Sequence, residues 1–142
     1  MVEEAVEKEM ISYMDGYRYQ LKNTYQVQVA IRPEQYTTSA FCSLTTTGLL
    51  TIMRGYAWDG ASGPTIDTKS SMRGSLVHDS LYQLIREGLS IDWRYLADQE
   101  LKIKCIEDGM WKWRANLWCW AVWNFARRSA TKDHKRKLET AP

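Results

Sequence analysis

The sequence predicts an α+β domain, with a small antiparallel sheet first and helices after it. Two observations support this prediction. Polar and apolar residues alternate with period two over much of the first 58 residues, whereas apolar residues recur every three or four positions after residue 70. A loop of small, turn-forming residues at 59–64 separates the two halves. We therefore expect one domain over residues 1–128, with strands at about 17–58 and helices at about 70–128, followed by a basic polar tail at 129–142.

The first half of the chain is expected to form short strands. Residues 1–14 fit either a short amphipathic helix, because Val6, Met10 and Met14 are four apart, or a solvated arm. Residues 17–21 and 25–31 alternate with period two, and residues 22–24 between them predict a hairpin turn, with Pro33 ending the pair. Two more strands are expected at 39–44 and 49–54, around a turn at 45–48.

The second half predicts three helices. The first spans about 70–86 and stops at Gly88, and the second begins near Ser90, a good cap, and ends at Gly109. The third spans roughly 110–128 and holds five of the seven tryptophans. Because residues 87–89 form a short link, the first two helices should make an antiparallel hairpin.

Composition excludes several classes of protein. A chain of 142 residues with 44% hydrophobic and 25% charged residues is typical of one globular domain. It has no apolar run long enough to span a bilayer, and its acidic start is unlike a secretory signal. Three cysteines, Cys42, Cys105 and Cys119, are an odd number without paired spacing, so neither a disulfide framework nor a zinc ribbon is expected. No glycine-rich phosphate loop is present in the sequence.

One group of polar residues on the predicted hairpin has the composition of a catalytic site. His78 and Tyr82 are four residues apart and share a helix face, and Asp98 on the facing helix should approach both. A carboxylate that binds one imidazole nitrogen leaves the other free to take a proton from water. The alternative is a buried polar network that fixes the register of the two helices.

A second carboxylate, Asp79, points about 100° away from His78 on the same helix. Together with Asp59 and the loop residues Gly60, Ser62 and Gly63, it has the oxygen ligands that Ca²⁺ accepts. Such an ion would polarise a carbonyl group and stabilise an oxyanion. The other reading of Asp59 is an ordinary turn former. Zinc is less well supported, because only one histidine is well placed.

Three motifs in the same order resemble a family of short, uncharacterised proteins that are common in bacteriophages and prophages. The motifs are Asp-x-Ala-Ser-x-Pro at 59–64, His-Asp-x-Leu-Tyr at 78–82 and Ala-Asp at 97–98, and the resemblance covers roughly residues 48–126. It implies a phage-type protein that is synthesised in the host cytoplasm.

The helical motif is also similar to the core of secreted phospholipase A(2) enzymes. That resemblance implies that His78 is a base, Asp79 a calcium ligand, and Tyr82 with Asp98 a supporting network. The disulfides and the Cys- and Gly-rich calcium loop of those enzymes have no counterpart in this sequence.

The third predicted helix is apolar nearly all round, so it should contribute both to the core and to a contact surface. Its candidate interface residues are Trp111, Trp118, Trp120 and Trp123. The default interpretation is a contact with a second copy or with virion proteins, and the alternative is a membrane interface. Arg127 and Arg128 are candidate contacts to phosphate or lipid, although a solvated charged end is the simpler reading. Nothing resembles a module that reads nucleic-acid sequence.

The leading interpretation is a calcium-assisted ester hydrolase that acts on phospholipid at the cell envelope, with its site at His78, Asp79, Tyr82 and Asp98. The alternative is a non-catalytic virion or tail component, or a host-interaction protein, that uses the same residues as a buried polar network.

Overall fold

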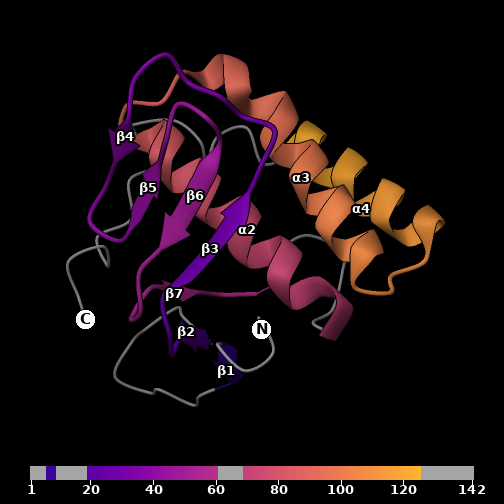
Figure 1. The fold of residues 1–142 in the computed structure, drawn as a ribbon. Helices are drawn as coiled ribbons and strands as arrows, with labels where there is room; N and C mark the ends of the chain where they lie inside the picture. Colours follow the sequence, from indigo (N-terminus) through magenta and orange to yellow (C-terminus); the bar gives the residue numbers. More distant parts are fainter. Residues whose placement is uncertain (1–5, 9–18, 61–68, 126–142) are drawn as a thin grey trace.

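The structure is a computed structural model that describes residues 6–8, 19–60 and 69–125. It is a mixed α+β fold with its sheets in the N-terminal half and its helices in the C-terminal half, as the sequence predicts (Figure 1). The strands are β1 Val6–Lys8, β2 Tyr19–Leu21, β3 Tyr25–Gln28, β4 Thr37–Thr38, β5 Cys42–Leu44, β6 Leu49–Ile52 and β7 Ala57–Trp58. The helices are α2 Lys69–Arg86, a 3₁₀ turn at Ile91–Trp93, α3 Arg94–Glu107 and α4 Lys112–Phe125.

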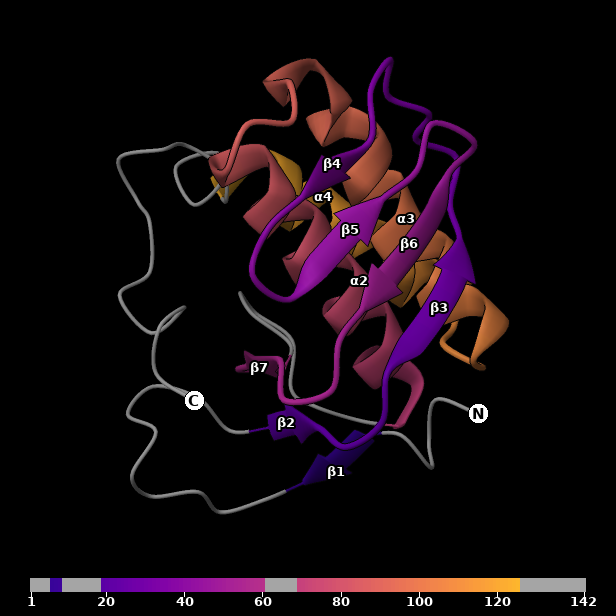
Figure 2. The same ribbon diagram turned by 60° about the vertical axis from the view of Figure 1, so that its left-hand side comes forward.

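The strands form two antiparallel sheets. The larger has the order β3-β6-β5-β4 and covers the helices, and the smaller has the order β1-β2-β7 (Figure 2). The turn expected at 45–48 is confirmed, since Gly48 has a φ of 93° and the Thr45 amide donates to the Leu49 carbonyl at 3.0 Å. On β5 and β6, alternate side chains such as Leu44, Leu50 and Ile52 are buried. This alternation is the period-two pattern of the sequence.

The prediction of a hairpin around residues 22–24 is wrong. Strand β2 pairs with β1 and β7, whereas β3 pairs with β6. Tyr19 lies opposite Trp58 and Tyr25 lies opposite Ile52, so both strands run against the segment 49–58 in one antiparallel register. The Leu21 amide, which donates to the Tyr56 carbonyl at 2.7 Å, continues that register. Residues 22–24 therefore interrupt a long pairing and do not reverse the chain.

The start of the chain does not form the amphipathic helix that is one of the two structures expected for it. Val6–Lys8 form strand β1, in which Val6 lies opposite Leu21 on β2, so this stretch is not helical. The edge of β2 offers unpaired backbone groups, and pairing with them overrides the weak helical spacing of the sequence. The other residues of the segment 1–14 lie outside the described part of the chain.

The three predicted helices are confirmed. Helix α2 matches its predicted range to within a residue, α3 is shorter than predicted at both ends, and α4 begins two residues late, with residues 126–128 outside the described part of the chain. Ser90 caps the 3₁₀ turn before α3, because its side chain accepts the Asp92 amide at 3.1 Å. Gly88, with a φ of 139°, ends α2 and reverses the chain into that turn. Helices α2 and α3 cross closely at Gly74, where an added Cβ would lie 2.5 Å from Cys105 Sγ. This crossing sets the distance between the two helices that carry the candidate site.

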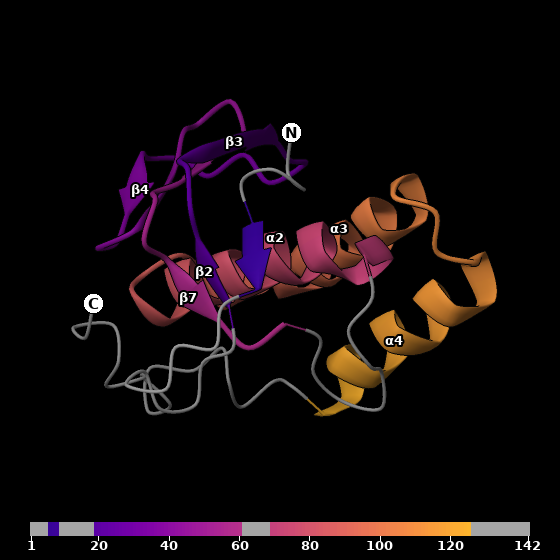
Figure 3. The ribbon, with the colours of Figure 1, turned by 90° about the horizontal axis from the view of Figure 1, so that it is seen from below.

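The core has two parts. The larger lies between the sheets and α2, and the smaller lies between α3 and α4. Helix α4 lies on the side of the α2–α3 pair that is opposite the larger sheet (Figure 3). Cys42, Cys105 and Cys119 are buried free thiols. None of the described helices is long and apolar enough to cross a membrane.

Candidate functional site

The α2–α3 hairpin brings together the three polar residues that the sequence singles out. His78 lies in the middle of α2, Tyr82 lies one turn further on, and Asp98 lies on α3. The His78 Nε2 atom lies 2.7 Å from Asp98 Oδ1, and the Tyr82 hydroxyl donates to the same oxygen at 2.7 Å. The rings of His78 and Tyr82 are 4.2 Å apart between centroids. The predicted juxtaposition is confirmed.

A fourth residue, Arg94, completes this network. Its Nε atom donates to the Tyr82 hydroxyl at 2.9 Å, and its terminal nitrogen donates to the backbone carbonyls of Val122, at 2.9 Å, and Trp123. The guanidinium also lies over the Trp123 ring, 4.5 Å from its centroid. Arg94 therefore connects α3 to α2 and to the last turn of α4.

Sequence reasoning gave Arg94 no role. The sequence contains one indication of its role. Arg94 lies four residues before Asp98, so both side chains share one face of α3. Helical spacing can identify that shared face. Helical spacing does not show which of many partners a long side chain contacts. The hydrogen bonds from Arg94 to Val122 and Trp123 therefore could not be predicted from the sequence.

The network lies in a nearly dry environment. Asp98 is 0% exposed and His78 is 8% exposed. Burial, and next the negative charge of Asp98, raise the pKa of Tyr82 well above its ordinary value, so its phenol stays protonated and donates. Asp98 Oδ2 is buried and has no hydrogen-bond partner in the described part of the chain. The carboxylate is thus held through one oxygen only.

The hydrogen bonds set the tautomer of a neutral His78. A carboxylate can only accept, so Nε2 must carry the proton that faces Asp98. The other ring nitrogen, Nδ1, then carries a lone pair, and within the described residues it makes no hydrogen bond. This arrangement is the one that a histidine base requires.

Asp79 belongs to a different environment. Its Oδ2 atom accepts a hydrogen bond from the Tyr56 hydroxyl, which belongs to the segment between β6 and β7. Burial, followed by the charge of Asp79, raises the pKa of Tyr56 well above its ordinary value. The carboxylate of Asp79 therefore contacts the sheet side of α2, while His78 contacts α3.

The residues expected to bind calcium with Asp79 are only partly described. Asp59 is exposed after β7, and Gly60 follows it with a φ of 85°. Ser62 and Gly63 lie outside the described residues. Among residues 6–8, 19–60 and 69–125, no group of three or more His, Cys, Asp or Glu side chains is placed to hold a metal ion. Calcium binding stays a prediction, and the described side chains do not form such a site.

The candidate interface residues divide between core and surface. Trp118 is 2% exposed and lies in the core between α3 and α4. Trp120 and Trp123 on α4, and Trp111 just before it, are exposed. Arg127 and Arg128 lie beyond the described residues.

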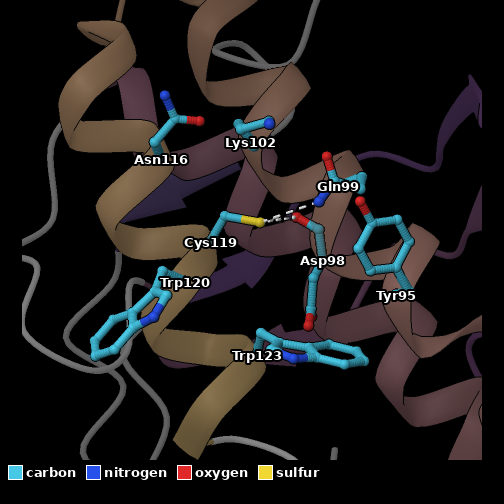
Figure 4. A pocket seen from close by; sticks show the side chains of 8 residues that line it. All are labelled: Tyr95, Asp98, Gln99, Lys102, Asn116, Cys119, Trp120 and Trp123. Atoms are coloured by element: carbon cyan, nitrogen blue, oxygen red, sulfur yellow. Dashed lines mark hydrogen bonds between the residues drawn. The ribbon is translucent and has the colours of Figure 1, made fainter.

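An open pocket of about 210 Å³ lies between α3 and α4, next to Asp98. Beside it the Cys119 thiol donates to the Asp98 carbonyl at 3.4 Å, and Gln99 Nε2 lies 3.5 Å from Cys119 Sγ (Figure 4). The lining residues are Tyr95, Asp98, Gln99, Lys102, Asn116, Cys119, Trp120 and Trp123. The pocket combines aromatic walls with amide and ammonium groups.

Comparison of the chain with protein-family models, with curated proteins and with solved structures finds no match. The protein is therefore described by its own structure, as an α+β domain with a buried His-Asp-Tyr-Arg network on a helical hairpin.

Proposed function

We propose that this protein is a phage-type ester hydrolase, acting on phospholipid at the cell envelope, in which His78 is the general base. The observation that carries the proposal is the 2.7 Å contact of His78 Nε2 with Asp98, which leaves Nδ1 without a partner among the described residues. A histidine oriented by a buried carboxylate is a common way to activate water near neutral pH.

The proposed reaction uses only groups of this chain. His78 Nδ1 takes a proton from a water molecule, whose oxygen bonds to the ester carbonyl carbon. The tetrahedral intermediate collapses as the ester carbon–oxygen bond breaks. The imidazolium returns its proton to the departing alkoxide, so the products are a carboxylic acid and an alcohol. Asp98 stabilises the transient imidazolium, and Tyr82 and Arg94 hold Asp98 in place.

Calcium enters the proposal only as a condition of the experiment. Ca²⁺ takes about six to eight oxygen ligands. In the described part of the chain Asp79 binds Tyr56, and no acidic cluster surrounds it. No step of the reaction is therefore assigned to the ion.

The proposal is tested by measuring fatty acid released from mixed phospholipid vesicles, with calcium or with chelator. We expect release by the wild-type protein and its loss in His78→Ala, because the variant lacks the Nδ1 lone pair to which the proposal assigns the proton transfer. His134→Ala is the matched control, since His134 is the only other histidine in the sequence. Release that survives in His78→Ala, or no release from any vesicle, contradicts the proposal.

A non-catalytic role is the second candidate, and the position of Arg94 favours it. This side chain joins α2, α3 and α4 through the Tyr82 hydroxyl and two α4 carbonyls. In this reading the network serves only to fix helix register in a virion, tail or host-interaction protein. In that case His78→Ala lowers the free energy of unfolding by about 1–3 kcal/mol, as lost buried hydrogen bonds do, and no hydrolysis is detected.

A further inference from the structure

The pocket between α3 and α4 has two chemically different sides. Figure 4 shows Lys102 and Asn116 on one side of the Cys119 thiol, and Trp120 and Trp123 on the other. The first side carries nitrogen donors and the second carries indole rings. A ligand that fills the pocket therefore contacts polar groups at one end and aromatic groups at the other.

The polar groups of the pocket are available to a ligand. Within the described residues the Lys102 ammonium forms no ion pair, and the side-chain amide of Asn116 makes no hydrogen bond. Among the same residues Gln99 uses only its Nε2 atom, which lies 3.5 Å from Cys119 Sγ. An ammonium group has three donors and an amide has two, so a bound acceptor can satisfy them without breaking a contact of the protein.

The acidic side chains of α3 other than Asp98 are paired outside the pocket. Glu100 lies 3.3 Å from Lys104, and Glu107 lies 2.6 Å from Arg73. Helix α4, on the opposite wall, contains no acidic residue. Lys102 therefore lacks a counter-ion in the described part of the chain, and the polar side of the pocket is positively charged.

Asp98 lines the pocket without offering its carboxylate to a ligand. The residue is 0% exposed, and its Oδ1 atom lies 2.7 Å from both His78 Nε2 and the Tyr82 hydroxyl on α2. Its backbone carbonyl accepts the Cys119 thiol beside the pocket. The negative charge of Asp98 is thus turned to the hairpin, whereas the Lys102 ammonium borders the pocket itself.

The aromatic side of the pocket fits a small flat ligand. Tyr95 meets the Trp123 ring in an edge contact, and Trp120 is the other aromatic wall. Aromatic side chains pair well with a further ring in edge or offset contact. The pocket has a volume of about 210 Å³. Because a cavity of roughly 150 Å³ holds benzene and drug-sized ligands occupy roughly 300 Å³ or more, the ligand is limited to one or two rings.

An organic cation is the alternative that aromatic walls suggest, since indole rings attract cations. Two observations oppose it. The Arg94 guanidinium already lies over the Trp123 ring, 4.5 Å from its centroid. Lys102 lies at the other end of the pocket. A bound cation would therefore lie between two like charges, whereas an anion would lie between two opposite ones.

From this geometry we propose that the pocket binds a small aromatic carboxylate. The carboxylate accepts from Lys102 and Asn116, and the ring packs against Trp120, Trp123 and Tyr95. A carboxylate carries the single negative charge that one lysine balances, whereas a phosphate monoester carries about −1.5 to −2 near neutral pH. Binding depends on α3 and α4 only, and not on whether His78 acts as a base.

The test is a proton–nitrogen NMR titration of the full chain with benzoate, with its neutral analogue benzamide and with the cation benzylamine. We expect benzoate to bind with a Kd of about 0.1–1 mM, as about ten non-hydrogen atoms allow. The side-chain N–H signals of Asn116, Gln99, Trp120 and Trp123 should shift together. Benzamide should bind about tenfold or more weakly, and only benzoate should lose affinity in about 0.5 M salt.

Two variants separate the two ends of the pocket. Lys102→Met keeps the length of the side chain and should weaken benzoate about tenfold or more, while benzamide binds as it does to the wild type. Trp120→Leu removes an aromatic wall and should weaken both ligands by a similar factor. Lys112→Met and Trp113→Leu are the matched controls, because both residues lie on α4 outside the pocket lining, and they should bind benzoate normally.

Four results would overturn the proposal. The first is the absence of any shift in the pocket signals at 10 mM benzoate, which is on the order of ten times the weakest expected Kd. The second is benzamide binding as tightly as benzoate, since no charge is then recognised. The third is benzylamine binding more tightly than benzoate, which makes the pocket a cation site. The fourth is an equal loss of benzoate affinity in Lys102→Met and Lys112→Met, which assigns the effect to overall charge.

Discussion

At the scale of single residues, the chemistry of the hairpin depends on how Asp98 divides its two oxygens. Oδ1 accepts from both His78 and Tyr82, whereas Oδ2 is buried without a hydrogen-bond partner in the described chain. An unsatisfied buried carboxylate oxygen costs free energy, and such costs are tolerated most often at functional sites. The network therefore fixes the ring orientation of His78, although it leaves Oδ2 of Asp98 without a hydrogen bond among the described residues.

Tyr82 gives this network a definite pH dependence. Its pKa is raised in the folded state by burial and by Asp98, so the folded protein holds a proton that the unfolded chain releases above about pH 10. The stabilising contribution is fully present below the unfolded pKa and is lost as the pH rises. We expect the free energy of unfolding to fall as the pH rises above about 10, and Tyr82→Phe to make that fall shallower.

Urea unfolding at a series of pH values measures this effect. Tyr56, whose pKa is raised by burial and Asp79, contributes a slope of the same sign, so Tyr56→Phe is the matched comparison. Identical alkaline slopes in the wild type and Tyr82→Phe would show that the phenol does not lie in the environment described.

At the scale of elements, local sequence predicts helices better than it predicts strand partners. The spacing of apolar residues and the short link at Gly88 are enough to place α2 against α3, and so to bring His78 to Asp98. The hairpin prediction for β2 and β3 fails because the turn signal between them is local, whereas the partner of both strands lies about 30 residues away, in segment 49–58. Turn-forming residues occur both where a strand is interrupted and where the chain reverses its direction.

The α2–α3 crossing can be tested at Gly74. An added Cβ would lie 2.5 Å from Cys105 Sγ and 3.0 Å from the Leu101 carbonyl oxygen, and backbone cannot move aside cheaply. We expect Gly74→Ala to lower the free energy of unfolding by about 1–3 kcal/mol, as overpacking does. Thermal or urea unfolding measures the change.

The double variant Gly74→Ala/Cys105→Ala provides the control. Removing Sγ takes away the closer of the two contacts, so the double variant should lose less stability than the two single losses together. Strict additivity would mean that the helices do not meet at these two residues.

At the scale of the whole molecule, the structure is a set of layers: sheet, helical hairpin, then α4 (Figures 1 and 3). The hairpin is covered by the sheet on one side and by α4 on the other, which explains how His78 and Asp98 become so deeply buried. Composition and periodicity predict the two halves and the three helices. They cannot predict which face of a helix that is apolar all round turns inward, and the core position of Trp118 beside exposed Trp120 is such a case.

The same limit applies to the candidate site. His78, Tyr82 and Asp98 could be brought together from helical spacing because short links constrain their geometry. Asp79 could not be placed in this way, because its partner Tyr56 comes from the strand-forming half of the chain. The contact between Asp79 and Tyr56 arises from the pairing of segment 49–58, which local patterns do not reveal.

The orientation of His78 by Asp98 is best tested by the tautomer of the His78 ring, measured by long-range proton–nitrogen correlation NMR of labelled protein at a pH where the ring is neutral. His78→Gln identifies the resonance, and His134 serves as the internal reference. We expect a proton on Nε2 and an unprotonated Nδ1, as a base held by Asp98 requires. A neutral ring with its proton on Nδ1 would contradict the proposed role of His78, because Nε2 could then donate nothing to Asp98.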